Sequence, residues 1–165
     1  MMARAFVSLG SNIEPEANLT RAAEGLRAQA GEFSASSVYH SKAVGFDGPD
    51  FLNAVVSLTT EYDVEGFARV LRELEDLQVR DRTQPRFSSR TVDLDFLLFD
   101  DLVCMTDSLE LPREEILQQA FVLQPLAEIA GDQRHPLTGL TFGKHWQDML
   151  AIDPNATLEK ADLVL

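Results

Sequence analysis

Two aspartates lie two residues apart in an apolar segment of the chain, "RTVDLDFLLF" at positions 90–99. Side chains alternate along a strand, so Asp93 and Asp95 would share one face. Two carboxylates on one face repel each other unless cations neutralise them, and an unpaired buried charge is strongly unfavourable. The fold must therefore bring a counter-charge to this pair. The apolar residues of the same segment would face the core: Val92, Leu94, Phe96 and Leu98.

Two kinds of counter-charge fit the aspartate pair equally well from the local pattern. Mg²⁺ is usually held by one or two carboxylates together with phosphate oxygens, so the pair suits Mg²⁺ ions that bridge to a phosphate-bearing substrate. Alternatively, Arg90 forms an ion pair with Asp93, and Asp95 lies at a wet edge of the sheet. The pattern alone leaves both interpretations open.

Basic residues are concentrated just before the aspartates, although the whole chain has a formal charge of −13. Asp81 is the one acid in the segment 80–90, which holds four arginines. A run of arginines is more often a solvated loop than a site, but its position beside two acids strengthens the case for a site. The overall acidity argues against general nucleic-acid binding, which depends on Lys and Arg contacts to phosphates.

The composition is that of an ordinary globular protein, and 165 residues fit one compact domain spanning 1–165. The single Cys104 cannot form an internal disulfide, and the chain does not open with the charged and apolar regions of a secretory leader. No apolar stretch approaches the roughly 20 residues needed to cross a bilayer. We therefore expect a monomeric cytoplasmic protein without a membrane partner.

The elements that must position these residues alternate between strand and helix patterns. We expect strands at 3–9, 32–41, 51–60 and 91–99, a helix at about 15–30 capped by Gly31, and a helix capped by Asp63. The order β-α-β-β-α-β predicts an α+β fold, a ferredoxin-like sandwich with helices packed on one face of an antiparallel sheet. The other face would remain available for a ligand, and the final third would form short helices and loops. The second helix would bury Val64, Phe67, Leu71, Leu74 and Leu77.

Five segments together resemble the 6-hydroxymethyl-7,8-dihydropterin pyrophosphokinases of folate biosynthesis. The resemblance covers most of the chain, in the order and spacing of that family. The combination of segments is specific, whereas a lone Asp-x-Asp would be weak evidence. It implies a transfer of the terminal pyrophosphoryl group of ATP to the hydroxymethyl oxygen of a reduced pterin, with release of AMP. The segments are "SLGSN" (8–12), "GFDGPDFLNAVV" (45–56), "LRELEDLQVR" (71–80), "RTVDLDFLLF" (90–99) and "FVLQPLAEIA" (121–130).

The resemblance assigns Asp93 and Asp95 to two Mg²⁺ ions along the ATP triphosphate. Asp95 would act in catalysis with Arg80 and Arg90, which match the arginines that handle phosphate in this family. Glu75 matches a helix glutamate near the nucleotide, although an exposed helix acid explains it equally well. Such transfers depend mainly on positioning and charge stabilisation, so metals and arginines should carry most of the catalysis.

Arg82 and Arg86 also match positions that meet ATP, on a loop that in this family closes over the substrates. The resemblance further implies that Phe51 and Phe121 stack on either side of the pterin, while Asn53 reads its polar edge. Taken alone, each phenylalanine would be plain core, whereas an amide inside "FLNAVV" needs hydrogen-bond partners if it is buried. Backbone groups near three further residues would also read that edge: Ser41, Val44 and Gly45.

The chain departs from the family pattern in the closing loop, just before the pterin loop and at two positions that contact the nucleotide phosphates. Residues 87–89 are Phe-Ser-Ser where the family usually has Trp-Gly-Pro, and Ser41-Lys42 replaces Thr-Pro. Arg113 and Gln119 stand where the family has a histidine and an arginine. An arginine can give phosphate a bidentate, permanently charged contact, so Arg113 is expected to bind ATP in place of both. A competing interpretation is that Arg113 only pairs with Glu114 or Glu115 on the surface. The alternative is a divergent relative that binds a pterin with altered or no pyrophosphokinase activity.

Overall fold

A computed structural model describes residues 2–43, 47–80 and 92–165 of the chain. The arginine-rich segment at 81–91 lies outside them, as do Val44 and Gly45. The elements follow in the order β1 (Ala3–Ser11), α1 (Pro15–Ala28), β2 (Phe33–Ala35), β3 (Tyr39–Ser41), β4 (Phe51–Thr60), α2 (Val64–Arg80) and β5 (Asp93–Phe99). The remaining elements are β6 (Cys104–Met105), β7 (Glu110–Leu111), the 3₁₀ helix η1 (Glu114–Leu117), α3 (Ala120–Ala130) and α4 (Phe142–Ile152).

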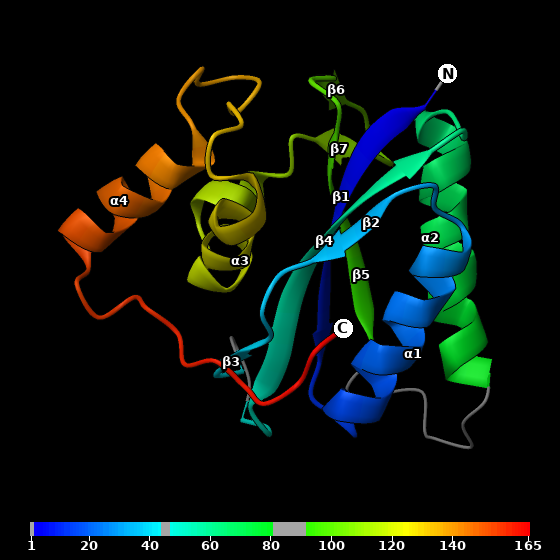
Figure 1. Cartoon of the computed structure of the whole chain (residues 1–165), viewed down its shortest axis with the longest axis horizontal. Helices are drawn as coiled ribbons and strands as arrows, with labels where there is room; N and C mark the ends of the chain where they lie inside the picture. Colours follow the sequence, from blue (N-terminus) through cyan, green and yellow to red (C-terminus); the bar gives the residue numbers. More distant parts are fainter. Residues whose placement is uncertain (1, 44–46, 81–91) are drawn as a thin grey trace.

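The main sheet is antiparallel and five-stranded, with β1 at its centre between β4 and β5. Both β2 and β3 pair with the outer edge of β4, whereas β6 and β7 form a separate two-stranded sheet. The α+β class is confirmed, and the expected order β-α-β-β-α-β holds except that its second strand is divided into β2 and β3. Figure 1 shows α1 and α2 on one side of the sheet and α3 and α4 on the other.

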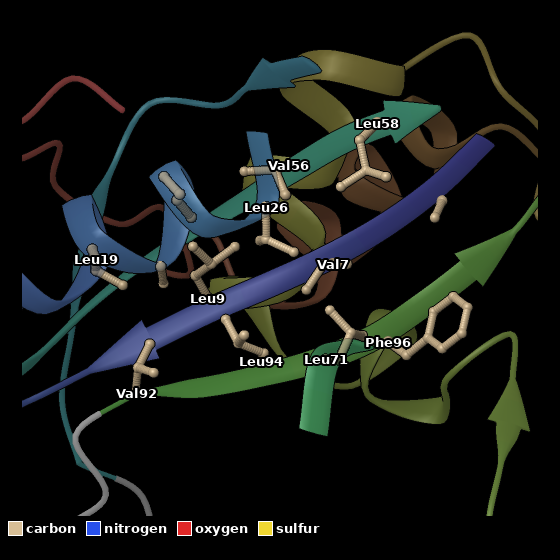
Figure 2. Close-up of a cluster of buried hydrophobic side chains, with 14 of the residues drawn as sticks. Val7, Leu9, Leu19, Leu26, Val56, Leu58, Leu71, Val92, Leu94 and Phe96 are labelled. Carbon is tan, nitrogen blue, oxygen red and sulfur yellow. The ribbon is translucent and has the colours of Figure 1, made fainter. Parts of the chain in front are cut away.

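The first face of the sheet packs against α1 and α2 (Figure 2). Side chains that alternate along β1, β4 and β5 meet the apolar faces of the two helices. Burying one such Val or Leu side chain contributes about 1.5–3 kcal/mol, so this layer is the main source of stability for the sheet. Val92, Leu94 and Phe96 lie in this cluster, as the alternation predicts. The cluster also includes Val7, Leu9, Leu19, Leu26, Val56, Leu58, Phe67 and Leu71.

The second face is not left open along its whole length, which corrects the expectation of helices on one face only. α3 packs over it and forms a second apolar cluster with Phe6 of β1 and Val55 of β4. α4 then packs on the outside of α3 through Phe142, Trp146 and Met149. Among the described residues, the end of this face that α3 leaves uncovered is the part that remains available for a ligand.

The prediction that Leu98 faces the same way as Leu94 was wrong. Leu98 lies in the second cluster, because the pairing of β1 with β5 shifts between Phe6 and Val7. Phe6 pairs with Leu98 and Val7 pairs with Phe96, so one extra residue interrupts the alternation at this bulge. β5 thereby supplies apolar side chains to both faces of the sheet.

The expected strand 32–41 is interrupted into β2 and β3. The Ser36 hydroxyl accepts a hydrogen bond from Val55 N at 2.9 Å, so a side chain takes the place of a backbone acceptor there. Ala35 pairs with Val56 and Tyr39 with Asn53, which leaves one extra residue on the edge side. The interruption sets β3 apart as a short strand of its own at the end of the sheet.

The helices also differ in detail from the sequence expectations. α1 ends at Ala28 with Gln29 as its C-cap, so Gly31 is not the cap; its N–H donates to Thr59 O at 3.0 Å. Asp63 caps α2 as predicted, because its Oδ1 accepts from Gly66 N at 2.7 Å. Leu77 was predicted to be buried but is 55% exposed, since the inward position one turn after Leu74 is taken by Gln78, whose Nε2 donates to Asn18 O.

Candidate functional site

Polar residues of three strands meet on the second face of the sheet, at the end that α3 leaves uncovered. Gly10 of β1 pairs with Asn53 on one side and with Asp93 on the other. In the next row Ser8 pairs with Asp95. Directly paired residues of antiparallel strands share a face, so the register gathers these side chains in one place.

These residues line a cavity of about 230 Å³. Its floor is the sheet, and α3, η1 and the chain after β3 form its walls. Sites for drug-sized ligands usually measure about 300–1,000 Å³, so the cavity fits one small flat group better than a whole nucleotide. It is lined by Ser8, Leu9, Gly10, Ser41, Lys42, Phe51, Asn53, Asp93, Asp95, Glu115 and Phe121.

Six of the residues predicted from the sequence therefore come together: Ser41, Phe51, Asn53, Asp93, Asp95 and Phe121. Phe51 of β4 and Phe121 of α3 are half-buried and line the cavity, although Phe121 also packs against the second apolar cluster. The cavity thus has aromatic and amide groups on one side and two carboxylates on the other.

Asn53 is 6% exposed, and its Nδ2 donates to Ser41 Oγ at 2.5 Å. Ser41 is itself buried, at the end of β3 opposite Phe51. The sequence predicted that the amide of Asn53 would need partners, and Ser41 is one of them. The pair fixes the orientation of an amide that lines the cavity.

Gly10 leaves room for this arrangement at the floor of the cavity. A Cβ at this position would lie 3.0 Å from Asn53 Oδ1 and 3.9 Å from Phe51 Cδ1. A contact of 3.0 Å requires the amide to move, so any side chain here would disturb Asn53 and fill part of the cavity.

Asp93 and Asp95 are half-buried and line the cavity, while Leu94 between them is buried in the first core cluster. Two carboxylates suit a Mg²⁺ ion that takes its other oxygens from water and phosphate. Among residues 2–43, 47–80 and 92–165, no group of three or more His, Cys, Asp or Glu side chains could hold a metal ion. The donor set thus fits a metal that arrives with an anionic ligand better than a closed structural site.

Glu75 of α2 reaches the same strand from the other face. Its Oε2 accepts a hydrogen bond from Leu94 N at 3.1 Å, and the residue is half-buried. It is therefore not the exposed helix acid that the sequence left open as an alternative. The contact ties α2 to β5 between the two aspartates.

Arg113 lies beside Asp95, at the start of η1. Its Nη2 is 3.6 Å from Asp95 Oδ1 and 2.8 Å from Glu115 Oε1, and its Nε also donates to Glu115. Burial lowers the pKa of Arg113, but Asp95, Glu115 and Glu110 outweigh that effect, so the pKa lies above its ordinary value. Arg113 does not line the cavity itself, but its guanidinium stays charged next to Asp95 at the carboxylate end.

Five residues that line the cavity were not singled out as site residues from the sequence: Ser8, Leu9, Gly10, Lys42 and Glu115. Ser8 and Gly10 alternate in "SLGSN", and that alternation could have placed them on one face of β1. The residues that lie opposite Ser8 and Gly10 are set by the pairing of β1 with β4 and β5, and the sequence of β1 alone does not reveal this pairing. Lys42 and Glu115 reach the cavity because of the paths that the chain takes after β3 and after β7. No pattern in the sequence indicated these positions.

Other predicted residues fall outside the described part of the chain: Val44, Gly45, Arg82, Arg86 and Arg90, together with the departure at 87–89. Arg80 is the last residue of α2. Gln119 precedes α3 and lines a groove against α4 rather than the cavity. Within the described ranges, no helix is long and apolar enough to cross a membrane.

Residues 6–131 match the family described as 7,8-dihydro-6-hydroxymethylpterin-pyrophosphokinase. A 2-amino-4-hydroxy-6-hydroxymethyldihydropteridine pyrophosphokinase from Pseudomonas aeruginosa is 34% identical over 166 residues, covering 97% of this chain and 98% of its own. Enzymes of the same name from Haemophilus influenzae and Methylorubrum extorquens are 34% and 37% identical, each over 79% of this chain and over 84% and 85% of their own.

Solved structures resemble the fold as well. The wild-type HPPK-DHPS of Plasmodium falciparum with pteroate superposes with a TM-score of 0.72 at 12% identity, over 92% of this chain. The same protein with STZ-DHP gives 0.73 at 12% identity, over 94% of this chain. This chain spans 43% of the length of both solved chains. At this level of identity the likeness concerns the fold.

Proposed function

Because the chain belongs to the 7,8-dihydro-6-hydroxymethylpterin-pyrophosphokinase family, we propose that it transfers pyrophosphate from ATP to 6-hydroxymethyl-7,8-dihydropterin in folate biosynthesis. The products are the pterin diphosphate and AMP. The observation that carries this proposal is that one cavity is lined by Phe51 and Asn53 of β4 on one side of β1 and by Asp93 and Asp95 of β5 on the other. The first suits a flat, polar-edged heterocycle, and the second suits the charge of a triphosphate with its metal.

The pterin lies between Phe51 and Phe121, with its polar edge toward Asn53. Aromatic stacking adds about 0.5–1.5 kcal/mol beyond the burial of area, which favours a flat ring at this position. The amide of Asn53 is held by Ser41, so its orientation is set before the pterin arrives. Backbone groups of Val44 and Gly45 complete the recognition of the edge.

Asp93 and Asp95 hold two Mg²⁺ ions, which supply the positive charge that neutralises the phosphate oxygens of ATP. The pair lies on the same cavity as the two phenylalanines, so the hydroxymethyl oxygen of the pterin is directed toward the phosphates. Arg80 and Arg90 bind the group in transfer, with Asp95 next to it. Positioning and charge then account for most of the rate enhancement.

ATP is bound by Glu75, Arg82, Arg86 and Arg113. Support for Arg113 comes from its place next to Asp95, with a guanidinium kept charged by the surrounding carboxylates. Glu75 acts from the far side of β5 by holding the backbone between the aspartates. A fixed arginine at this point offers phosphate a bidentate contact that a histidine cannot.

The direct test is to incubate the protein with ATP, Mg²⁺ and 6-hydroxymethyl-7,8-dihydropterin and to measure AMP and the pterin diphosphate by chromatography. We expect both products in equal amounts. Release of ADP, or no reaction, would contradict the proposal. If no AMP forms, calorimetry with the pterin on the same preparation tests the alternative. Pterin binding without transfer of pyrophosphate would identify a divergent relative.

A further inference from the structure

β3 forms part of the cavity wall although it is a short strand at the edge of the sheet. Its last residue, Ser41, accepts the hydrogen bond that orients Asn53, at 2.5 Å. β3 pairs with β4 through three residues only, Tyr39, His40 and Ser41, and it is separated from β2 by the interruption after Ala35. Three paired residues alone give little stability. The position of Ser41 must depend on contacts from outside the sheet.

Glu128 of α3 supplies the first set of these contacts. Its Oε2 accepts from Ser37 N at 3.0 Å and from Ser37 Oγ at 2.9 Å, and its Oε1 accepts from the Tyr39 hydroxyl at 2.5 Å. Both carboxylate oxygens are thus engaged with the segment that leads into β3. Burial raises the pKa of Glu128, but the hydrogen bonds from Tyr39 and Ser37 outweigh burial and keep it below its ordinary value.

The C-terminal segment, residues 158–165, supplies the second set from the free edge of β3. Glu159 O accepts from His40 N at 2.8 Å, and Ala161 N donates to Val38 O at 2.8 Å. These bonds place Lys160 opposite Tyr39. Figure 1 shows the chain after α4 running past β3 to its end.

The C-terminal segment is anchored at both of its ends. Leu158 N donates to Gln124 Oε1 of α3 at 2.8 Å, while Leu163 and Leu165 pack on the first core cluster. The attraction of Lys160 also lowers the pKa of Glu128, after the larger effects of burial and the hydrogen bonds from Tyr39 and Ser37. α3 and the C-terminal segment therefore hold β3 from two sides.

We propose that Glu128 and the C-terminal segment are positioning residues for the pterin: they fix β3 so that Ser41 keeps the amide of Asn53 aimed into the cavity. This inference rests on the proposed function, and it extends it to residues that do not line the cavity. The C-terminal segment lies beyond residues 6–131, where the family match ends. Pterin recognition in this chain thus depends on a part of the sequence outside the matched region.

The first test uses steady-state kinetics of Glu128→Ala and Glu128→Gln in the full-length protein. Glu128→Ala removes all three acceptor contacts, and we expect about a tenfold higher KM for the pterin, the size of effect for one or two lost hydrogen bonds. The KM for ATP and kcat should change by less than about twofold. Glu128→Gln keeps one oxygen to accept from Tyr39 and should recover part of the loss. Glu24→Ala, an exposed glutamate on α1, is the matched control.

The second test breaks the contact of the C-terminal segment without touching α3. Ala161→Pro removes the N–H that donates to Val38 O, whereas Asp162→Pro, at the exposed neighbour, removes neither bond to β3. Hydrogen exchange of the amides in Tyr39–Ser41 should become faster in Ala161→Pro and Glu128→Ala but not in the two controls. The pterin KM should rise in parallel with this exchange.

The outcomes separate this inference from the proposed function. If the wild-type protein forms no AMP, the proposed function fails, and exchange of the β3 amides still decides whether Glu128 and the C-terminal segment hold β3. If the wild type is active, an unchanged pterin KM in all variants overturns the inference. Equal changes in the KM values for ATP and the pterin would also overturn it, because they indicate general loss of structure.

Discussion

Asp93 and Asp95 present the clearest chemical requirement at the scale of single residues. Two half-buried carboxylates face a cavity that, on the proposed function, must accept the negative charge of ATP. We expect Asp93→Asn and Asp95→Asn each to lower kcat on the order of 100-fold or more, because charge stabilisation of the transferred group would be lost. Both side chains keep their shape, so Tm should change by less than about 4 °C, the effect of roughly 1 kcal/mol.

The measurement is AMP formation at saturating substrate, with thermal unfolding of each variant by circular dichroism. Asp107→Asn, at an exposed position away from the cavity, serves as the control and should keep full activity. ATP binding by the wild type should also require Mg²⁺ in calorimetry. Full activity of the wild type in excess chelator would show that the aspartates serve another purpose.

Arg113 is shared between a carboxylate of the cavity and a carboxylate of η1. Glu115 is nearer, at 2.8 Å against 3.6 Å for Asp95, so the stronger pair holds the guanidinium in place without closing on Asp95. Both side chains are about one-third exposed, and ion pairs near the surface are worth about 0–1 kcal/mol, so the Arg113–Glu115 pair orients the guanidinium but adds little to the stability of the protein. Its position favours a role in binding the nucleotide.

Arg113→Ala is therefore expected to raise the KM for ATP by about tenfold or more while changing the pterin KM by less than about twofold. Gln119→Ala should leave both constants near wild type, because Gln119 lines the groove between α3 and α4. Both are read from steady-state kinetics with each substrate varied in turn. If the KM for ATP is unaltered in Arg113→Ala, Arg113 does not replace the family's histidine and arginine.

At the scale of elements, local patterns predicted what a single strand or helix decides. Alternation along β5 placed Asp93, Asp95 and Leu94 on their correct faces, and Asp63 marked the start of α2. The error at Leu98 arose because the bulge depends on how β5 pairs with β1, which the sequence of β5 does not contain. The same holds for Ser8 and Gly10, since neighbours across a sheet are fixed by register.

The helices of the last third were the hardest to place. Their apolar residues indicated burial but not which face of the sheet they cover, and α3 closes part of the face that was expected to stay open. Glu128 and the residues after α4 carried no sign of their contacts with β3, because those contacts join segments about 90 to 120 residues apart in sequence. The sequence thus predicted which kinds of residue form the candidate site and which strands carry them. It did not predict which segments form the walls of the cavity.

The floor and sides of the cavity give a prediction at this scale, because they come from β1, β4 and α3. Phe51→Ala and Phe121→Ala should each weaken pterin binding by about 1 kcal/mol or more through lost stacking. Asn53→Ala should weaken it as well, because polar groups of the pterin edge would be left unpaired. Gly10→Ala should weaken it by a different route, since its Cβ would meet Asn53 Oδ1 at 3.0 Å.

Calorimetry with the pterin is the appropriate measurement, and Tm separates binding from stability. Phe33→Ala is the matched aromatic control: Phe33 lies on β2, packs against the first core cluster and is absent from the cavity. It should lower Tm without changing pterin affinity. If Phe51→Ala, Phe121→Ala and Asn53→Ala bind the pterin as tightly as the wild type does, these three residues serve packing rather than pterin binding.

At the scale of the whole molecule, the chain divides into the region of the family match and the part that follows it. Residues 132–165 begin with a loop that leads into α4, and α4 packs on α3. His135 organises this loop: its Nδ1 accepts from Leu137 N at 3.1 Å and from Thr138 N at 3.3 Å. The residue is 4% exposed, and its ring contacts the rings of Phe142 and His145. The neutral ring is required for both acceptor contacts.

This arrangement makes the stability of the whole molecule depend on pH. Burial lowers the pKa of His135, and the neighbouring His145 lowers it further. The folded state then binds fewer protons than the unfolded state just below the ordinary pKa of about 6.5. The stability that neutral His135 contributes is complete above about pH 6.5 and is lost as pH falls through the depressed folded pKa. Tm of the wild type should therefore decrease between pH 7 and pH 5.

A variant comparison isolates His135 from the carboxylates that also titrate on the acid side. Asn at this position offers an oxygen near the place of Nδ1 and cannot be protonated, so His135→Asn should flatten the decrease in Tm over this range. His40→Asn, at an exposed histidine of β3, should leave the decrease unchanged. Scanning calorimetry of the three proteins at several pH values measures the slopes. A slope in His135→Asn equal to that of the wild type would assign the pH dependence to other groups, and the acceptor contacts of His135 would then have no part in it.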